Sequence, residues 1–318
     1  MELKVISFNI RCANDPDGHS IAERAPRLHK VISEYDPDVI GVQEFRDAWQ
    51  EQFDKYFLDK YDFYRVPRDE MPGGESVPIL WKKDSFECWR RGTFWLSDTP
   101  EEMSGGWDEK YHKNRICSYV VLFDKKTREL FTVMNTHFGF GDKGQVASAK
   151  LIYDYSQRIS GCPTFVTGDF NMNPDSAGYS EMVKHFVDVN AVTSKDMRTT
   201  YHGYDPEKHP NSHIDFCFID EKVKPLSHKI ITDTVEGKYP SDHYGLFIEL
   251  DITNSVKIKN VLCPVCHKYT FKEENEQCPV CNWTHWFYQE IFPYERKMDN
   301  IMSLLEAREA YAKGEEIY

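Results

Sequence analysis

The chain has 318 residues, of which 40% are hydrophobic and 14% aromatic, so it can bury a substantial core and is not a disordered protein. No stretch approaches the roughly 18 consecutive apolar residues that a membrane span requires. A formal net charge of −13 argues against long-range attraction to a polyanion, although a local basic cleft is compatible with it. Residues 1–4 lead straight into a strand-like run without the apolar core of a signal peptide, so we expect a cytoplasmic protein.

The hydrophobic pattern of residues 1–252 mixes strand-like and helical segments. Residues 3–8 alternate as a strand does, and Ser20 is placed to cap a helix whose apolar positions follow helical spacing as far as Ile32. Mixed strands, hairpins and helices favour an α+β fold with helices covering the outer sheet faces. Further strands are predicted at 39–42, 78–82, 86–95, 116–123, 130–137, 164–168, 214–219 and 244–252, and further helices at about 45–60 and 146–153.

Six segments join an apolar run to carboxylate, amide or imidazole groups. Polar residues at strand ends deliver side chains to one rim of a sheet, where active sites are built. Ordinary polar strand caps are the alternative, but oxygen ligands and histidines recur here in the combination that metal-assisted hydrolysis needs. The six segments are Ser7–Arg11, Val42–Glu44, Asn135–His137, Gly168–Asn171, His213–Phe216 and Ser241–His243.

In this order the six segments resemble the endonuclease/exonuclease/phosphatase superfamily, which includes deoxyribonuclease I, and the resemblance covers about residues 1–252. It implies a four-layer α/β/β/α sandwich, in which two mixed sheets pack face to face between helices. It also implies hydrolysis of phosphate esters with Mg²⁺ or Mn²⁺. Residues 92–97 and 105–108 are similar to a bacterial branch of this family.

The resemblance implies that three residues with oxygen ligands hold the catalytic ion. Glu44 is the first of these, helped by Asn9 and Asp242. Mg²⁺ prefers one or two carboxylates completed by water, and the bound ion polarises the phosphoryl group. For Glu44 alone, a solvated carboxylate at a strand end is the alternative.

The resemblance also implies the acid–base groups. Asp169 orients or deprotonates the attacking water. Asn171, two residues further along an extended segment, points to the same side and donates to the developing charge, with an Asx-turn as the alternative for this stretch. His243 contacts a phosphoryl oxygen, and Asp215 fixes its tautomer.

Further residues match positions that face the substrate in the family. His137 occupies the second histidine position, and Glu75 falls where deoxyribonuclease I has its partner carboxylate, with a surface-loop glutamate as the alternative. Arg11 and Arg115 match phosphate-facing arginines, and a rim salt bridge is the alternative for both. The role of His213 stays open.

The C-terminal part carries a second metal motif, which resembles bacterial Cys-Pro-x-Cys zinc ribbons. Four thiolates in two Cys-x₂-Cys pairs can close the tetrahedral site that structural Zn²⁺ prefers, and iron in a rubredoxin-like site is the alternative. His267 and His285 are expected to be bystanders. The four cysteines are Cys263, Cys266, Cys278 and Cys281.

We therefore predict a phosphoesterase domain at 1–252, a zinc ribbon at 260–293 and an amphipathic helix at 294–318. One face of that helix is expected to be apolar. Its residues are Met298, Ile301, Met302 and Leu305.

The leading functional prediction is a Mg²⁺- or Mn²⁺-dependent phosphatase or phosphodiesterase that acts on a small soluble substrate. A nuclease on short or single-stranded DNA or RNA is the runner-up. A third possibility is a nucleic-acid- or protein-binding module that works through the ribbon. The tail has no dense basic stripe, which favours docking onto the enzyme's own domain or another protein.

We expect rim loops at 67–77, 97–114 and 194–212, with Trp107, Tyr111, Tyr201 and Tyr204, to set specificity.

Overall fold

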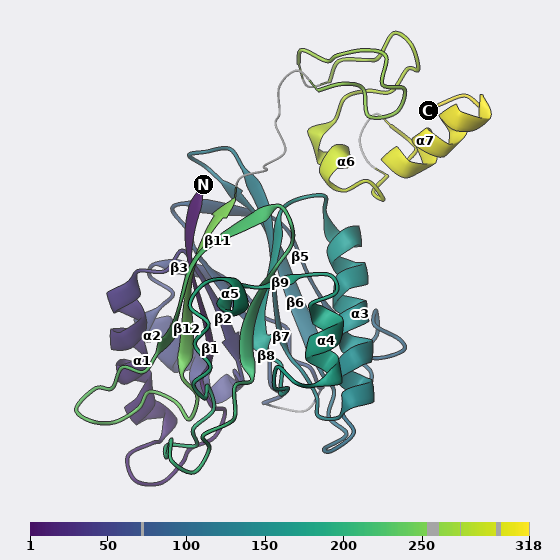
Figure 1. Cartoon of the computed structure of the whole chain (residues 1–318). Coiled ribbons are helices and arrows are strands. Elements are labelled where there is room, and N and C mark those ends of the chain that lie inside the picture. Colours follow the sequence, from purple (N-terminus) through teal and green to yellow (C-terminus); the bar gives the residue numbers. More distant parts are fainter. Residues whose placement is uncertain (71–72, 253–260, 274, 297–299, 318) are drawn as a thin grey trace. The chain divides into compact units, whose positions relative to one another are not determined.

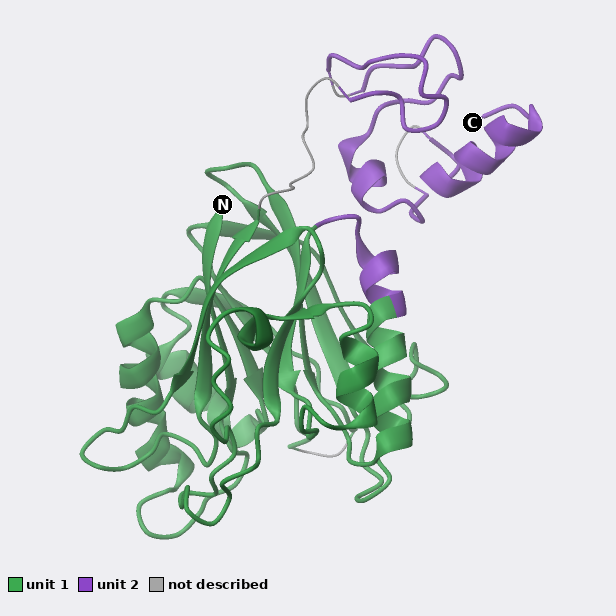
Figure 2. Ribbon diagram, in the orientation of Figure 1, with its two compact units in different colours: residues 1–153, 163–254 green, residues 154–162, 255–318 purple. Residues whose placement is uncertain are grey.

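The computed structural model describes residues 1–70, 73–252, 261–273, 275–296 and 300–317. The chain divides into two compact units (Figure 2): unit 1 contains residues 1–153 and 163–254, and unit 2 contains residues 154–162 and 255–318. Among the described residues, no helix has both the length and the apolar character needed to cross a membrane.

Unit 1 contains two six-stranded sheets, shown in Figure 1. The first sheet comprises β1 (Glu2–Asn9), β2 (Val39–Gln43), β3 (Tyr61–Tyr64), β4 (Ile79–Lys82), β11 (Val223–Ile231) and β12 (Gly245–Ile252), in the spatial order β11-β12-β1-β2-β4-β3. The second comprises β5 (Phe86–Trp95), β6 (Ile116–Asp124), β7 (Leu130–His137), β8 (Thr164–Asp169), β9 (Val187–Asp188) and β10 (Asp215–Ile219), in the order β5-β6-β7-β8-β10-β9.

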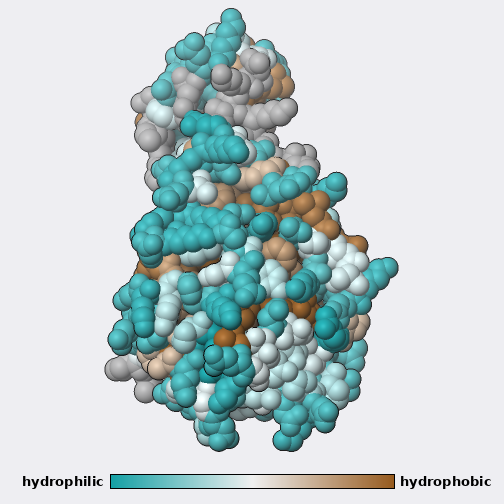
Figure 3. All heavy atoms as spheres, turned by 90° about the vertical axis from the view of Figure 1, so that its left-hand side faces the viewer, coloured by the Kyte–Doolittle hydropathy of each residue, from teal (hydrophilic) through white to brown (hydrophobic). Residues whose placement is uncertain are grey.

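Helices cover the outer faces of both sheets. On one side lie α1 (Ile21–Tyr35), the short 3₁₀ turn η1 (Asp47–Trp49) and α2 (Gln50–Tyr56); on the other lie α3 (Asp142–Ile159) and α4 (Ala177–Met182) (Figure 1). A further short helix is α5 (Val189–Val192). The predicted α/β/β/α sandwich is confirmed. Figure 3 shows the side that carries α1 and α2, where hydrophilic residues predominate and apolar ones form small separate groups.

The apolar runs of the central strands are explained by burial on both faces. In β1, Val5 belongs to the core between the two sheets, whereas Ile6 belongs to the core under α1, together with Leu28 of that helix. Successive strand residues point to opposite faces, so a strand between two cores must be apolar at nearly every position. Helix α1 begins as predicted, since the Glu23 carboxylate accepts the backbone N–H of Ser20 at 3.1 Å.

Most predicted elements of unit 1 are confirmed, and the differences have local causes. The helix expected at 45–60 is shorter, because α2 ends at Tyr56 and β3 follows. Strand β11 was not predicted, because Pro225 interrupts its pattern. In the structure, the register against β12 shifts between Pro225 and Ser227, which accommodates a residue without a backbone donor.

Buried hydrogen bonds of Asn135 join the two sheets. Asn135 of β7 donates from Nδ2 to the backbone carbonyls of Val42 (2.8 Å) and Pro78 (2.9 Å) in the opposite sheet. Gly41 of β2 lies against this contact, and a Cβ there would come within 2.8 Å of Asn135 Oδ1 and 2.4 Å of Thr167 Oγ1. Only glycine permits so close an approach of the sheets at this position.

Replacing Gly41 with alanine should therefore destabilise unit 1. We expect Gly41→Ala to lower the free energy of unfolding by about 1–3 kcal/mol, the usual cost of overpacking a core. Urea denaturation measures this change. Gly161→Ala is the matched control, because a Cβ there meets nothing within 4 Å; it should stay within about 0.5 kcal/mol of the parent. Equal stabilities of the two variants would contradict the inter-sheet constraint.

Unit 2 contains α6 (Phe287–Ile291) and α7 (Leu304–Lys313). Its core joins the four cysteines of the metal motif to Phe271, Trp283 and the buried face of α7. The prediction of a helix over 294–318 is wrong in extent. Helix α7 begins only after Ser303, whose Oγ caps the helix by accepting the backbone N–H of Glu306 at 3.3 Å.

The apolar face predicted for this helix is also wrong. Ile301 precedes α7 and is 73% exposed, and Met298 lies outside the described residues. The buried face of the helix consists of Leu304, Ala307 and Ala310. The Ser-x-x-Glu sequence of a capping box at 303–306 was the signal for the true start.

Candidate active site and cysteine cluster

The polar strand ends of unit 1 converge from both sheets. In the second sheet, His137 at the end of β7 and Asp215 at the start of β10 both lie opposite Asp169, the last residue of β8. In the first sheet, Asn9 ends β1, and Glu44 directly follows β2. Strand pairing within each sheet and packing of the two sheets thus gather residues as far apart in sequence as Asn9 and Asp215.

Asn9 connects the two halves of this site. Its fully buried amide donates from Nδ2 to Asp169 Oδ2 at 2.9 Å and to Glu44 Oε1 at 3.2 Å, and its Oδ1 accepts the backbone N–H of Arg11 at 3.0 Å. Ser241 Oγ donates to the Asn9 carbonyl at 2.7 Å. Asn9 therefore holds carboxylates from both sheets in place, a bridging function that the sequence did not indicate.

His243 lies between two buried carboxylates. Its Nδ1 is 3.0 Å from Asp215 Oδ2, and its Nε2 is 3.8 Å from Asp169 Oδ2. Burial lowers the pKa of His243, but the charge of Asp215 and the hydrogen bond to it outweigh burial and raise the pKa to about 10. Burial and the neighbouring Asp215 raise the pKa of Asp169 to about 7. The arrangement pairs a stable imidazolium with a carboxyl group that can exchange protons near neutral pH.

Two further carboxylates face the same cavity. Burial raises the pKa of Glu44, but hydrogen bonding from Cys12, whose backbone N–H lies at 2.9 Å, outweighs it and lowers the pKa overall. Burial raises the pKa of Asp242, and the negative charge of Glu44 raises it further. Arg11 Nε is 3.6 Å from Asp242 Oδ2 but is also bound to Asp15. This pair of oxygen-rich groups suits a hard divalent cation.

Three residues of the site have left-handed backbone conformations. Arg11, Glu44 and Asn171 have φ angles of 60°, 61° and 48°, which are uncommon for residues other than glycine and concentrate at functional sites. The extended geometry predicted for residues 169–171 is therefore wrong. The backbone N–H of Asn171 donates to Asp169 Oδ1 at 3.0 Å, which is the Asx-turn alternative.

These residues surround a cavity of about 620 Å³, within the usual range for small-molecule sites. Asn9 and Asp215 do not line the cavity but hydrogen-bond to residues that do, Asp169 and His243. Tyr111 and Tyr201 of the rim loops line it, whereas Trp107 and Tyr204 are not among the lining residues. The predicted site residues along its wall are Arg11, Glu44, Glu75, Arg115, His137, Asp169, Asn171, Asp242 and His243.

Glu75 does not pair with His137, the partner that the resemblance implied. Its carboxylate binds Arg46 Nη2 and Arg68 Nη1, both at 2.9 Å, and makes no hydrogen bond with His137. His137 Nε2 instead lies 3.5 Å from Asp169 Oδ2. Burial and the nearby charges of Arg115 and Arg68 hold the pKa of His137 well below its usual range, so this ring is neutral. No sequence motif indicated the part played by Arg68.

His213 does not face the cavity. Its Nδ1 lies 2.7 Å from the carbonyl oxygen of Arg198, and its ring packs against Phe216 with centroids 5.1 Å apart. The residues on either side, Ser212 and Ile214, line the cavity instead. His213 therefore has a structural role in holding the loop that precedes β10.

The four cysteines of unit 2 form a compact cluster, in which all four sulfur atoms lie within 4.8 Å of one another. The distances Cys263 Sγ–Cys281 Sγ and Cys266 Sγ–Cys278 Sγ are both 3.6 Å. This is too long for a disulfide, and it is close to the ~3.8 Å edge of a tetrahedron with zinc–sulfur bonds of about 2.3 Å. The set therefore fits a tetrahedral thiolate site.

The two cysteine pairs are built alike. The backbone N–H of His267 donates to the Cys263 carbonyl at 3.0 Å, and that of Asn282 donates to the Cys278 carbonyl at 2.9 Å. His267 and Asn282 have φ angles of 54° and 63°. His285 hydrogen-bonds to Glu290 rather than joining the cluster.

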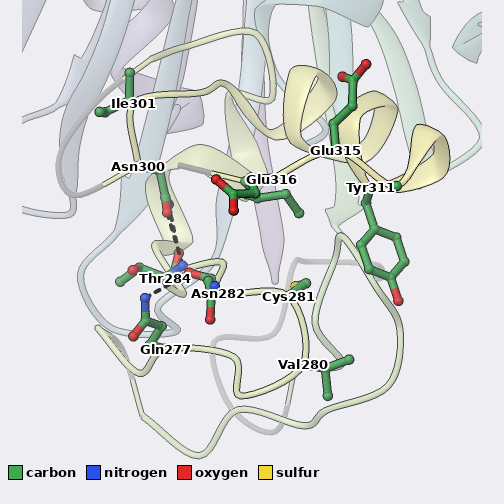
Figure 4. A pocket seen from close by; sticks show the side chains of 12 residues that line it. Gln277, Val280, Cys281, Asn282, Thr284, Asn300, Ile301, Tyr311, Glu315 and Glu316 are labelled. Carbon is green, nitrogen blue, oxygen red and sulfur yellow. Dashed lines mark hydrogen bonds between the residues drawn. The ribbon is translucent and has the colours of Figure 1, made fainter.

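A second cavity, of about 650 Å³, lies in unit 2 beside Cys281 (Figure 4). Asn300 and Thr284 both line it and are joined by a hydrogen bond, in which the Asn300 side chain donates to the Thr284 carbonyl at 2.8 Å. The residues that line this cavity include no histidine or arginine. The acid–base pair described above belongs to the cavity of unit 1.

The site combines carboxylates, an amide and two histidines at the strand ends of two sheets that helices cover. Together these features define a phosphoester-cleaving hydrolase. The sequence from 6 to 243 matches the endonuclease/exonuclease/phosphatase family, and the chain belongs to that family. Residues 261–314 match a second family, the cysteine-rich CPCC family. No curated protein sequence matches the chain.

Several solved structures share the fold. An endonuclease/exonuclease/phosphatase family protein from Bacteroides thetaiotaomicron is 30% identical with a TM-score of 0.73, covering 79% of this chain and 97% of its own. A mannosyl-6-phosphatase from the same organism is 29% identical with a TM-score of 0.71, covering 78% and 99%. The human nocturnin catalytic domain is 17% identical with a TM-score of 0.64, covering 79% and 94%, and shares the fold alone.

Proposed function

We propose that this protein is a cytoplasmic hydrolase that cleaves a small soluble phosphate ester with the help of Mg²⁺ or Mn²⁺. The observation that carries the proposal is the Asn9 bridge, which places the Asp169–His243 pair beside Glu44 in one cavity. The similarity to a mannosyl-6-phosphatase and the cavity of about 620 Å³ both support a small substrate.

Glu44 and Asp242 are the residues that would hold the divalent ion, with Asn9 beside them. Both carboxylates line the cavity, and the negative charge of Glu44 adds to burial in raising the pKa of Asp242. A bound divalent cation supplies Lewis-acid polarisation of the phosphoryl group and charge stabilisation for the leaving oxygen. In this proposal Asn9 keeps Glu44 in position through its Nδ2.

In this proposal the acid and the base of the reaction are side chains of the protein. Asp169 orients the attacking water and accepts its proton, because its raised pKa makes it a base near neutral pH. The His243 imidazolium donates from Nε2 to a phosphoryl oxygen, and Asp215 holds its Nδ1 proton. Asn171 and neutral His137 line the same wall and can donate to the remaining phosphoryl oxygens.

A nuclease acting on short single-stranded nucleic acid is the second candidate. The observation in its favour is the half-exposed Tyr111 at the cavity mouth, beside Phe140 and beneath the Lys110 ammonium, since aromatic and cationic groups together bind single strands. The overall charge of −13 disfavours this candidate, because phosphate neutralisation drives such binding.

The cysteine cluster is proposed to bind one structural Zn²⁺, with the phosphoesterase domain at 1–252 and the ribbon at 260–293 as separate folding parts. Four buried thiolates leave no open coordination position, so catalysis is not expected there. The ribbon is proposed to serve docking, either to a protein partner or within the chain.

Hydrolysis should depend on added divalent metal. We expect EDTA to abolish turnover of bis-p-nitrophenyl phosphate or p-nitrophenyl phosphate, and Mg²⁺ or Mn²⁺ to restore it, because the proposed ligands are hard oxygen donors. Zinc content, measured in parallel, should stay at one per chain. Full activity in protein that lacks every metal except that zinc would contradict the oxygen site.

Loss of either acid–base group should slow the chemical step. We expect Asp169→Asn and His243→Ala to lower kcat by about 10²–10⁴. Steady-state kinetics at saturating metal, with melting curves to establish folding, measure the effect. Asp175→Asn is the control, because Asp175 is exposed in the same loop. A folded Asp169→Asn variant that keeps more than roughly a third of the parent kcat would rule out the assigned role.

Removing one thiolate should release the ion of the ribbon. Purified protein should hold about one zinc per chain, and Cys278→Ser should lose it and unfold residues 261–293, because metal binding and folding are coupled in so small a unit. Elemental analysis and limited proteolysis give the two readouts. Cys88→Ser, a change in unit 1, should retain the metal. A Cys278→Ser protein with full zinc content would be incompatible with a four-thiolate site.

A further inference from the structure

A fully buried arginine of helix α1 binds the loop that follows β1. The side chain of Arg24 has no exposed surface, so its charge is costly to bury unless its donors are satisfied. Its guanidinium group donates to four backbone carbonyl oxygens: Nε to His19 at 2.8 Å, Nη1 to Ile10 at 2.6 Å, and Nη2 to Arg11 at 3.0 Å and Ala13 at 2.6 Å. One side chain therefore fixes the course of this loop.

Trp49 strengthens the same contact from the other side of the loop. Its indole is fully buried, and the Arg24 guanidinium carbon lies 5.2 Å from the centroid of the Trp49 ring. Trp49 Nε1 donates to the Arg11 carbonyl at 3.1 Å, so this carbonyl accepts from two different elements. Arg11 has a φ angle of 60°, an uncommon conformation that persists only where the surroundings hold it. The two donors provide that support.

The turn held in this way presents a backbone donor to Glu44. Cys12 lies between the two carbonyl groups that Arg24 Nη2 binds, and its N–H donates to Glu44 Oε2 at 2.9 Å. Asn9 Nδ2 donates to the other carboxylate oxygen, Oε1, at 3.2 Å. Both oxygens of Glu44 are thus oriented by groups of the same loop region. Each carboxylate oxygen accepts more than one bond, so lone pairs remain for a cation.

We propose that Arg24 is a positioning residue for the divalent-metal site, which acts by fixing the Cys12 peptide that holds the Glu44 carboxylate in place. The inference rests on the proposed function, which assigns the ion to Glu44 and Asp242. Arg24 is not among the residues that line the cavity, so it acts through Glu44 rather than on the substrate. Groups that orient a metal ligand in this way typically change metal affinity by about 10–100-fold when they are removed.

The substitution Arg24→Lys tests the proposal. Lysine keeps the positive charge but has a single ammonium group in place of the planar fork, so it cannot bind all four carbonyl groups. Electron paramagnetic resonance of Mn²⁺, with full-length protein that retains its zinc, measures metal binding directly. We expect the Kd for Mn²⁺ to rise at least about tenfold. At saturating Mn²⁺, kcat should stay within about threefold of the parent, because Arg24 does not contact the reacting groups.

Two further variants separate positioning from a general loss of stability. Leu28→Ala removes a fully buried side chain from the core under the same helix, so it should lower Tm but leave the Kd for Mn²⁺ unchanged. Trp49→Phe keeps an aromatic ring beside Arg24 but removes the donor to the Arg11 carbonyl. We expect this smaller change to raise the Kd for Mn²⁺ by about threefold.

The outcomes that overturn the inference are distinct from those that contradict the proposed function. A folded Arg24→Lys protein with the parent affinity for Mn²⁺ would overturn the inference, and so would an equal loss of affinity in Leu28→Ala. Should Arg24→Lys fail to fold, an unchanged Kd in Trp49→Phe would have the same force. A parent protein that binds no Mn²⁺ would instead contradict the proposed function.

Discussion

The side-chain amide of Asn9 is the contact on which the active site depends. One Nδ2 group bonds a carboxylate from each sheet, so the two sheets must pack at a distance and in a register that bring Asp169 and Glu44 within its reach. A one-residue slip of β1 would turn Asn9 to the opposite face and separate the two carboxylates. The close approach at Gly41, deeper between the same sheets, sets the spacing that this bridge requires.

Features that strand geometry determines could be predicted from the sequence. Asp169, Asp215 and His137 end or begin apolar strands, so period-two alternation and pairing bring them to one rim. The partners of Glu75 and the role of Arg68 could not be predicted, because loops far apart in the chain bring them together. The left-handed conformation of Asn171 was also missed, since an Asp-x-Asn sequence is compatible with both a turn and an extended segment.

Local charge distribution, rather than the net charge, describes what this cavity can bind. The chain carries −13 overall, yet cations as well as carboxylates line the cavity. The total charge opposes association with long polyanions at a distance, where solvent screens individual groups. Inside the cavity, the low local dielectric makes the nearby groups dominate, as the opposite pKa shifts of His243 and His137 show.

The chain contains two sets of metal-binding groups, and they suit different metals. Oxygen groups of Glu44 and Asp242 suit hard ions such as Mg²⁺, whereas the four thiolates of unit 2 suit zinc or iron. Cys12 lies beside Glu44, and a thiolate there would attract soft metals to the catalytic end. Burial and the charge of Glu44 raise the pKa of Cys12, so it remains a neutral thiol and a poor ligand. The same carboxylate that would hold the hard ion therefore also helps to keep a competing soft ligand protonated.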